Sequence, residues 1–192
     1  MTTEPVWSPE VGGRPSAWSA VAWFAAAVVG SAVLGLLGGL IWGEAAPRAL
    51  LQEISAGTAE LMNAETRAFI GADAWFSGIA VVAGLLTGII GYRFCIARHS
   101  GGTRAVVAAG LILGGVAGAF VMLWLGQQIG LSAYNQHLAS SANGTVFPSS
   151  ITLGAKSALA FWPMFTAIVI LVAEWGTRPA AETPAPDAFS PR

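Results

Sequence analysis

Residues 105–126 read AVVAAGLILGGVAGAFVMLWLG, a stretch of uncharged and mostly apolar side chains. A helix needs about 20 such residues to cross a hydrocarbon layer about 30 Å thick, because each residue adds about 1.5 Å. The stretch lies in a gap of 51 residues, between Arg104 and Lys156, that contains no Asp, Glu, Lys or Arg. A membrane-spanning helix is therefore predicted here.

Three other gaps between charged residues meet the same requirement. They are the 29 residues before Glu44, the 19 residues before Arg93 and the 17 residues before Glu174. The last gap is long enough if Lys156 extends its ammonium group to the membrane surface. We therefore expect an all-α integral membrane protein whose transmembrane helices form a bundle. The four spans are expected at about 18–43, 74–94, 105–127 and 154–175, within a membrane domain of residues 17–175.

The composition agrees with this fold class. Of the 192 residues, 55% are hydrophobic and 10% are charged, whereas soluble domains carry about 25% charged residues. The net charge of −1 gives no indication of nucleic-acid binding. One cysteine, Cys95, excludes an internal disulfide, and two histidines alone cannot build a metal site. We expect a lipid bilayer as the main partner, and no metal, cofactor or nucleic acid.

The basic residues predict the orientation. Loop 93–104 contains three arginines and no acid, whereas connection 44–73 contains five acids and two arginines. Short basic loops stay on the cytoplasmic side of a membrane. We expect a multi-pass plasma-membrane protein with both termini in the cytoplasm. Residues 1–16 and 176–192 lack an apolar period and are expected to be disordered tails.

Connection 44–73 is too long for a tight turn, so we expect a short, partly ordered element outside the membrane. Its apolar residues fit one or two amphipathic helices when counted with a period of 3.6. They also fit a hairpin that turns at residues 55–58. The alanine content and Pro47 favour helix slightly, and both interpretations stay open.

A second outer segment, 127–150, carries no charge and gathers polar side chains between Gln127 and His137. We interpret it as a hydrated loop or frayed helix end. A small polar ligand site is the alternative.

Glycines spaced one helical turn apart occur in the first three spans. Small residues at this spacing let two helix backbones approach closely. We expect packing within the bundle, with association with a partner membrane protein or a second copy as the alternative. The glycines concerned are Gly35, Gly39, Gly84, Gly88, Gly110, Gly114 and Gly118.

Tryptophans lie near most predicted span ends, where the indole ring prefers the membrane interface. Trp42, Trp75 and Trp124 are expected at the outer boundary, and Trp18 and Trp175 at the inner one.

Pro163 lies inside the fourth predicted span. Proline removes a backbone hydrogen bond and clashes with the preceding turn, so a kink is predicted. A static bend is the commoner use of such a kink, and a gate is the alternative.

Lys156 is the ionisable residue closest to a span interior. Asp73 and Glu65, at the outer end of the second span, are the acids that could neutralise it. We predict an Asp73–Lys156 ion pair, with a lysine that extends alone to the interface as the alternative.

The order of these features resembles a group of small four-span membrane proteins of unknown function from high-GC Gram-positive bacteria. The resemblance covers about residues 20–175. Its clearest motifs are FIGADAWF at Phe69–Phe76 and AKSALAFWP at Ala155–Pro163. It implies a plasma-membrane location and a four-helix fold, and it implies no activity.

No ionisable residue lies near the middle of a predicted span, where coupled transport would require one. A nucleophile–base pair is also not recognisable, so we do not expect an enzyme. The leading hypothesis is a non-catalytic accessory or assembly protein of the cell envelope. The alternative is a small transporter or channel-like permeation protein, with Pro163 and the polar residues of 127–137 along its path.

Overall fold

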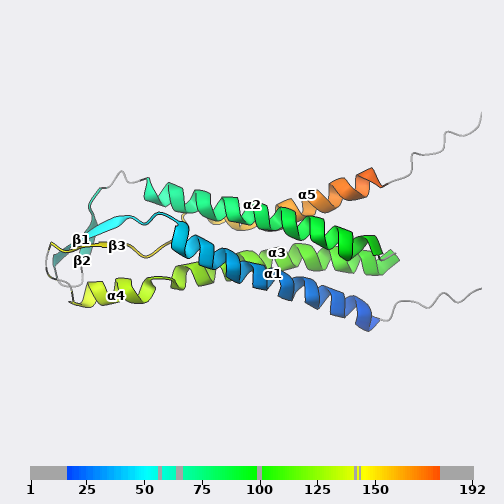
Figure 1. Cartoon of the computed structure of the whole chain (residues 1–192), viewed down its shortest axis with the longest axis horizontal. Coiled ribbons are helices and arrows are strands. Elements are labelled where there is room, and N and C mark those ends of the chain that lie inside the picture. The colour runs from blue at the N-terminus through cyan, green and yellow to red at the C-terminus, as the bar shows by residue number, and fades with distance from the viewer. Residues whose placement is uncertain are drawn as a thin grey trace, which may run out of the picture.

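The computed structural model describes residues 17–55, 58–63, 67–98, 101–140, 142 and 144–177. The expected disordered tails lie outside the described residues, apart from Gly176 and Thr177. Four long helices lie side by side, and a small sheet covers one end of them (Figure 1). All four are long and apolar enough to cross a membrane, which confirms the predicted fold class.

The helices alternate in direction, so both ends of the described chain lie at the end opposite the sheet (Figure 1). We call the two ends of the bundle the sheet end and, after Arg93, Arg98 and Arg104, the arginine end. The long helices are α1 (Ala17–Ala45), α2 (Ala68–Phe94), α3 (Gly101–Gln128) and α5 (Phe161–Gly176). Helix α2 begins six residues before the expected start of the second span. A short 3₁₀ helix, η1 (Ile96–Arg98), follows α2.

The connection between α1 and α2 forms a hairpin. Of the two interpretations left open by the sequence, the slightly favoured helical one was therefore wrong. Strand β1 (Leu50–Ser55) pairs antiparallel with β2 (Thr58–Leu61) and, on its other edge, with β3 (Val146–Pro148). Leu51 is the central residue, opposite Leu61 on one side and Phe147 on the other. A two-stranded hairpin alone is marginally stable. The third strand comes from a segment distant in sequence, and a local pattern cannot reveal it.

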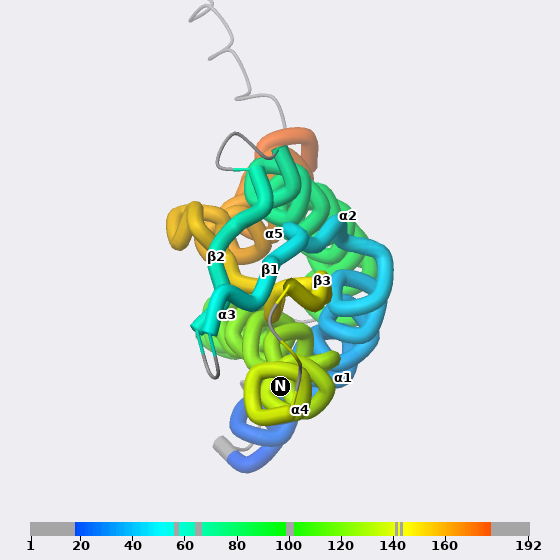
Figure 2. Tube along the Cα trace, turned by 90° about the vertical axis from the view of Figure 1, so that its left-hand side faces the viewer, coloured from blue at the N-terminus to red at the C-terminus, as the bar shows by residue number. Residues whose placement is uncertain are grey.

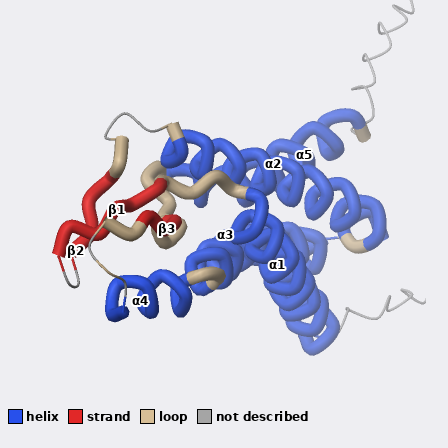
Figure 3. The backbone as a smooth tube through the Cα atoms, turned by 60° about the vertical axis from the view of Figure 1, so that its left-hand side comes forward, coloured by secondary structure: helices blue, strands red, loops and turns tan. Residues whose placement is uncertain are grey.

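The second outer segment is more ordered than expected. It forms helix α4 (Leu131–Ser140) and strand β3, which lie together beside β1 (Figures 2 and 3). The rings of Tyr134 and His137 lie 6.0 Å and 5.3 Å from the ring of Phe147, centroid to centroid. Phe147 is buried. These two residues of the expected polar cluster therefore pack on the sheet.

The bundle consists of two closely packed helix pairs. Helix α1 packs mainly against α3, and α2 packs mainly against α5. Figure 2 views the sheet end and shows the two pairs on opposite sides. All seven glycines singled out in the sequence lie in contacts within the bundle. Gly35, Gly39, Gly110, Gly114 and Gly118 lie between α1 and α3, and Gly84 and Gly88 lie between α2 and α5.

Two tryptophans lie in the core of the bundle. The side chains of Trp42 and Trp162 are fully buried. The indole N–H of Trp42 donates to the carbonyl oxygen of Ala72 over 2.8 Å, and that of Trp162 donates to Oγ1 of Thr87 over 3.2 Å. Trp42 lies near the sheet end of α1, but its polar atom has a partner inside the protein, so the ring packs in the core and is not exposed at the surface of the helix. The other four tryptophans expected at the boundaries are exposed: Trp18, Trp75, Trp124 and Trp175.

The fourth span starts as a 3₁₀ helix, η2 (Lys156–Ala160), which continues directly into α5. Pro163 is the third residue of α5. In the first turn of a helix the N–H groups have no partner within the helix, so proline removes no bond there. The structure thus places Pro163 close to the junction of a 3₁₀ and an α-helical segment, and the kink stays a prediction.

Candidate functional site

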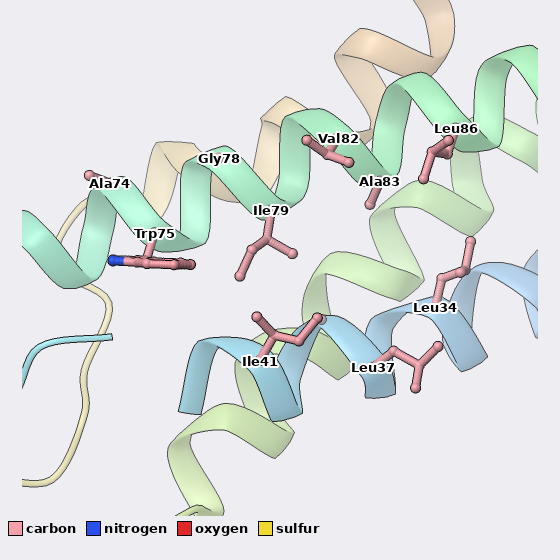
Figure 4. Close-up of a pocket in the computed structure, with 11 residues that line it drawn as sticks. Leu34, Leu37, Ile41, Ala74, Trp75, Gly78, Ile79, Val82, Ala83 and Leu86 are labelled. Atoms are coloured by element: carbon pink, nitrogen blue, oxygen red, sulfur yellow. The ribbon is translucent and has the colours of Figure 1, made fainter. Parts of the chain in front are cut away.

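A lateral groove lies between α1 and α2 in the described structure. These two helices contact each other less than either contacts its own close partner. The groove has a volume of about 690 Å³ and is lined by 11 residues, all of them apolar (Figure 4). It lies along two helices that are long and apolar enough to span a membrane, so in a bilayer it would open toward the lipid chains.

Both helices contribute side chains that point into the groove. Those labelled in Figure 4 include Leu34, Leu37 and Ile41 of α1, and Trp75, Ile79 and Leu86 of α2. From Ala74 to Leu86 the groove follows α2 over 13 residues, or about 18 Å for the 12 steps of 1.5 Å between them. Trp75 lies toward the sheet end. The groove is therefore long, narrow and without a strongly polar group.

One wall of the groove carries two small residues one turn apart, Ala74 and Gly78. A Cβ atom added to Gly78 would meet no atom within 4 Å, in contrast to the seven glycines packed inside the bundle. A helix backbone or an alkyl chain could approach α2 closely at this point. The sequence analysis missed Gly78. It was missed because it has no glycine partner four residues away. Its spacing of four residues from another small residue, Ala74, is the signal that could have found it.

Asp73 lies on α2 at the sheet end and contacts the chain just before Lys156. Its carboxylate accepts hydrogen bonds from the backbone N–H groups of Gly154 and Ala155, each over 2.9 Å. Within the described part of the chain, one ion pair is closer than 4.0 Å, and it does not involve Asp73. The predicted Asp73–Lys156 ion pair is therefore not formed. Lys156 is exposed. Glu65, the second acid considered as its partner, lies outside the described residues.

The reason for this difference is local geometry. The turn before η2 presents two neighbouring N–H groups that need acceptors, and a carboxylate satisfies both at once. An exposed lysine gains little from a fixed ion pair in water. Asp73 thus contacts the segment next to Lys156, as predicted, but through the backbone N–H groups of Gly154 and Ala155 instead of the lysine side chain.

Arg48 occupies a position that the sequence analysis did not single out. Its Nη2 donates to the carbonyl oxygens of Gly43, in the last turn of α1, over 2.6 Å and of Ile129, directly after α3, over 3.2 Å. Gly130 has a φ of +81°, and a Cβ atom there would collide with the Arg48 guanidinium. A cation suits the C-terminal ends of helices, where carbonyl groups are unpaired. Arg48 therefore closes the sheet end of the α1–α3 pair.

A polar cluster joins three helices at the arginine end. Nε of Arg104 on α3 donates to Oε1 of Glu174 on α5 over 2.7 Å. Nη2 of Arg104 donates to the hydroxyl of Tyr92 on α2 over 3.3 Å, and that hydroxyl lies 3.3 Å from the carbonyl oxygen of Ala173. Each residue stands at the end of a different predicted span. Sequence alone did not indicate that these ends meet.

The described residues contain no group of three or more His, Cys, Asp or Glu side chains placed to hold a metal ion. Glu53, on the central strand β1, is buried, and its backbone N–H and C=O pair with Thr145 and Gly144. The apolar groove is therefore the stronger candidate for binding another molecule.

Comparison with known proteins gives no match: no family model, curated protein or solved structure matches this chain. The likeness to the four-span group from high-GC Gram-positive bacteria thus stays a prediction from its motifs.

Proposed function

We propose that this four-span membrane protein is a non-catalytic accessory or assembly protein of the cell envelope. It lies in the plasma membrane, with both termini cytoplasmic, in a bacterium of the high-GC Gram-positive group that its motifs resemble. Its groove between α1 and α2 binds a membrane-embedded apolar segment of a partner protein. The observation that carries the proposal is this groove, because it is lined by apolar residues alone and runs along two helices that are long and apolar enough to span a membrane.

The physical basis is close packing. Lipid chains are as apolar as leucine, so burying apolar surface gives helices little reason to associate in a membrane. Association depends on shape, and small residues allow it. Glycines within the bundle are already covered by neighbouring helices, whereas Gly78 has open space in front of it. Ala74 and Gly78 therefore form the wall that supports docking.

The test uses two glycines that are alike except for their position. Gly78 lines the groove, and Gly30 of α1 does not line it; a Cβ atom at either would meet nothing within 4 Å. Gly78→Leu fills the groove, and Gly30→Leu adds the same side chain elsewhere. Tagged protein is purified from its native membranes in mild detergent, and co-purifying proteins are quantified by mass spectrometry.

We expect a stoichiometric membrane partner with the wild type and with Gly30→Leu, and its loss with Gly78→Leu. Equal yield and melting temperature of the two variants would show that folding is unaffected. Recovery of the wild type alone, as a monomer without a partner, would count against an assembly role. A partner retained equally by both variants would move the docking site away from the groove.

The alternative, a permeation protein, had rested on Pro163 and the polar residues near His137. Pro163 lies in the first turn of α5, and the His137 ring stacks on Phe147 of β3. Neither residue therefore supplies support for a polar path. Flux through liposomes that contain the purified protein would revive this alternative if Asp73→Asn or Lys156→Ala abolished it.

A further inference from the structure

The arginine end carries a second pocket, separate from the groove. It has a volume of about 480 Å³ and is lined by Tyr92, Arg93, Phe94, Ala97 and Arg98. These residues belong to the end of α2 and to η1. The lining thus combines two cations with two aromatic rings.

No carboxylate among the described residues lies within 4.0 Å of either cation of this pocket. Among the described residues, Arg104 is the arginine that has a carboxylate within 4.0 Å. The guanidinium carbon of Arg98 lies 5.7 Å from the centroid of the Phe94 ring, close enough for a cation–π contact. This contact orients Arg98 beside Arg93 without cancelling its charge. The pocket therefore favours an anion.

The backbone that presents these arginines is held in place. Ile96, the first residue of η1, is fully buried against Val107 and Leu111 of α3 and Ile170 of α5. The N–H of Cys95 also donates to the carbonyl oxygen of Gly91 over 2.9 Å, which extends the helical turn. The pocket therefore rests on a packed turn.

The position of the pocket, where the apolar surface of a membrane-spanning helix ends, indicates the class of anion. Ile90 and Phe94, one turn apart near the end of α2, are both about half exposed, and they belong to the apolar surface of a membrane-spanning helix. The arginines follow at the point where that surface ends. A phospholipid at this depth places alkyl chains against Ile90 and Phe94 and its phosphate beside the guanidinium groups.

We propose that this pocket binds the headgroup of an anionic phospholipid through Arg93 and Arg98. A guanidinium group donates several hydrogen bonds in a planar fork that suits phosphate oxygens. The inference does not depend on the proposed accessory function, since lipid binding at the arginine end does not require a partner in the groove.

The test compares lipids, not proteins. The full chain is reconstituted in nanodiscs of phosphatidylcholine that contain a small fraction of phosphatidylglycerol, and bound lipid is counted by native mass spectrometry. We compare the wild type with an Arg93→Gln/Arg98→Gln double variant. Arg67→Gln is the matched control, because Arg67 is an exposed arginine at the opposite end of α2.

We expect the wild type and Arg67→Gln to retain phosphatidylglycerol in preference to phosphatidylcholine. Retention should weaken by about 30-fold in the double variant, or about fivefold per arginine. An Arg93→Lys/Arg98→Lys variant should restore much of it, since the charge returns.

Three outcomes would overturn the proposal. One is equal retention by the wild type and the double variant. Another is an equal loss caused by Arg67→Gln, which would indicate a general effect of charge. The third is retention of inorganic phosphate, in nanodiscs of pure phosphatidylcholine, that is as strong as the retention of phosphatidylglycerol. That result would assign the pocket to free anions. An unfolded double variant would be recognised by its circular dichroism, and the single variants would then replace it.

Discussion

Arg104 of α3 and Glu174 of α5 form an ion pair that joins two membrane-spanning helices at the arginine end. Each side chain is 34% exposed, so water screens the pair. We expect Arg104→Gln and Glu174→Gln each to lower the free energy of unfolding. The coupling energy between the two substitutions should be about 0.5–1 kcal/mol, as for exposed pairs. A double-mutant cycle of chemical unfolding in micelles measures this energy. The coupling should shrink at high salt, and strictly additive effects would show that the pair contributes nothing.

Asp73 provides the second prediction, because its carboxylate accepts two backbone hydrogen bonds from the turn before η2. Asp73→Ala should lower the free energy of unfolding by about 1–2 kcal/mol, in the range of a lost helix cap. Asp73→Asn should cost less, since its side chain keeps one acceptor oxygen. Lys156→Met should have a smaller effect, because Lys156 is exposed and forms no ion pair with Asp73.

The control is the double variant Asp73→Ala/Lys156→Met. We expect a coupling energy below about 0.5 kcal/mol, the level at which independent sites are treated as additive. A larger coupling would mean that the two side chains interact in the membrane despite the geometry described above.

The four spans could be predicted because charged side chains are excluded from the hydrocarbon layer, so the gaps between them outline each helix. Where a charge lies at a helix end, this rule fails by several residues. Asp73 suggested an outer limit for the second span, yet α2 begins at Ala68. The carboxylate is accepted inside the helix because the chain before η2 supplies donors to it.

Contacts between distant segments could not be predicted in this way. Strand β1 obtains its second partner from Val146–Pro148, and no local period indicates such a pairing. Trp42 stands near a span end, as an interface tryptophan does, but the carbonyl of Ala72 gives its N–H a buried partner. The groove depends on how closely α1 and α2 approach, which follows from their packing on α3 and α5.

Glycine packing between α1 and α3 gives the third prediction. A Cβ atom at Gly35 would collide with the backbone of Gly118, whereas one at Gly30, on the same helix, would meet nothing within 4 Å. Gly35→Ala should therefore destabilise the protein by about 1–3 kcal/mol through overpacking. Gly30→Ala should be neutral or stabilising by up to about 1 kcal/mol, because alanine favours helix. Thermal unfolding of the two variants compares them directly, and equal melting temperatures would contradict the observed contact.

The last prediction concerns orientation. Arg93, Arg98 and Arg104 lie at the same end of the bundle as both ends of the described chain, and the sheet lies at the other (Figure 1). Because basic segments stay inside, we expect the arginine end in the cytoplasm. Cys95, the single thiol of the chain, lies at this end and should react with an impermeant maleimide only after the membrane is opened.

Cys95 is half-buried, so two exposed positions make the measurement sharper. In a Cys95→Ser background, Glu60→Cys places a thiol on β2 and Ala97→Cys places one on η1. Intact cells should label the first variant and spare the second until permeabilisation, after which both should react. The opposite pattern would invert the topology, and it would place the phospholipid pocket of Arg93 and Arg98 in the outer leaflet.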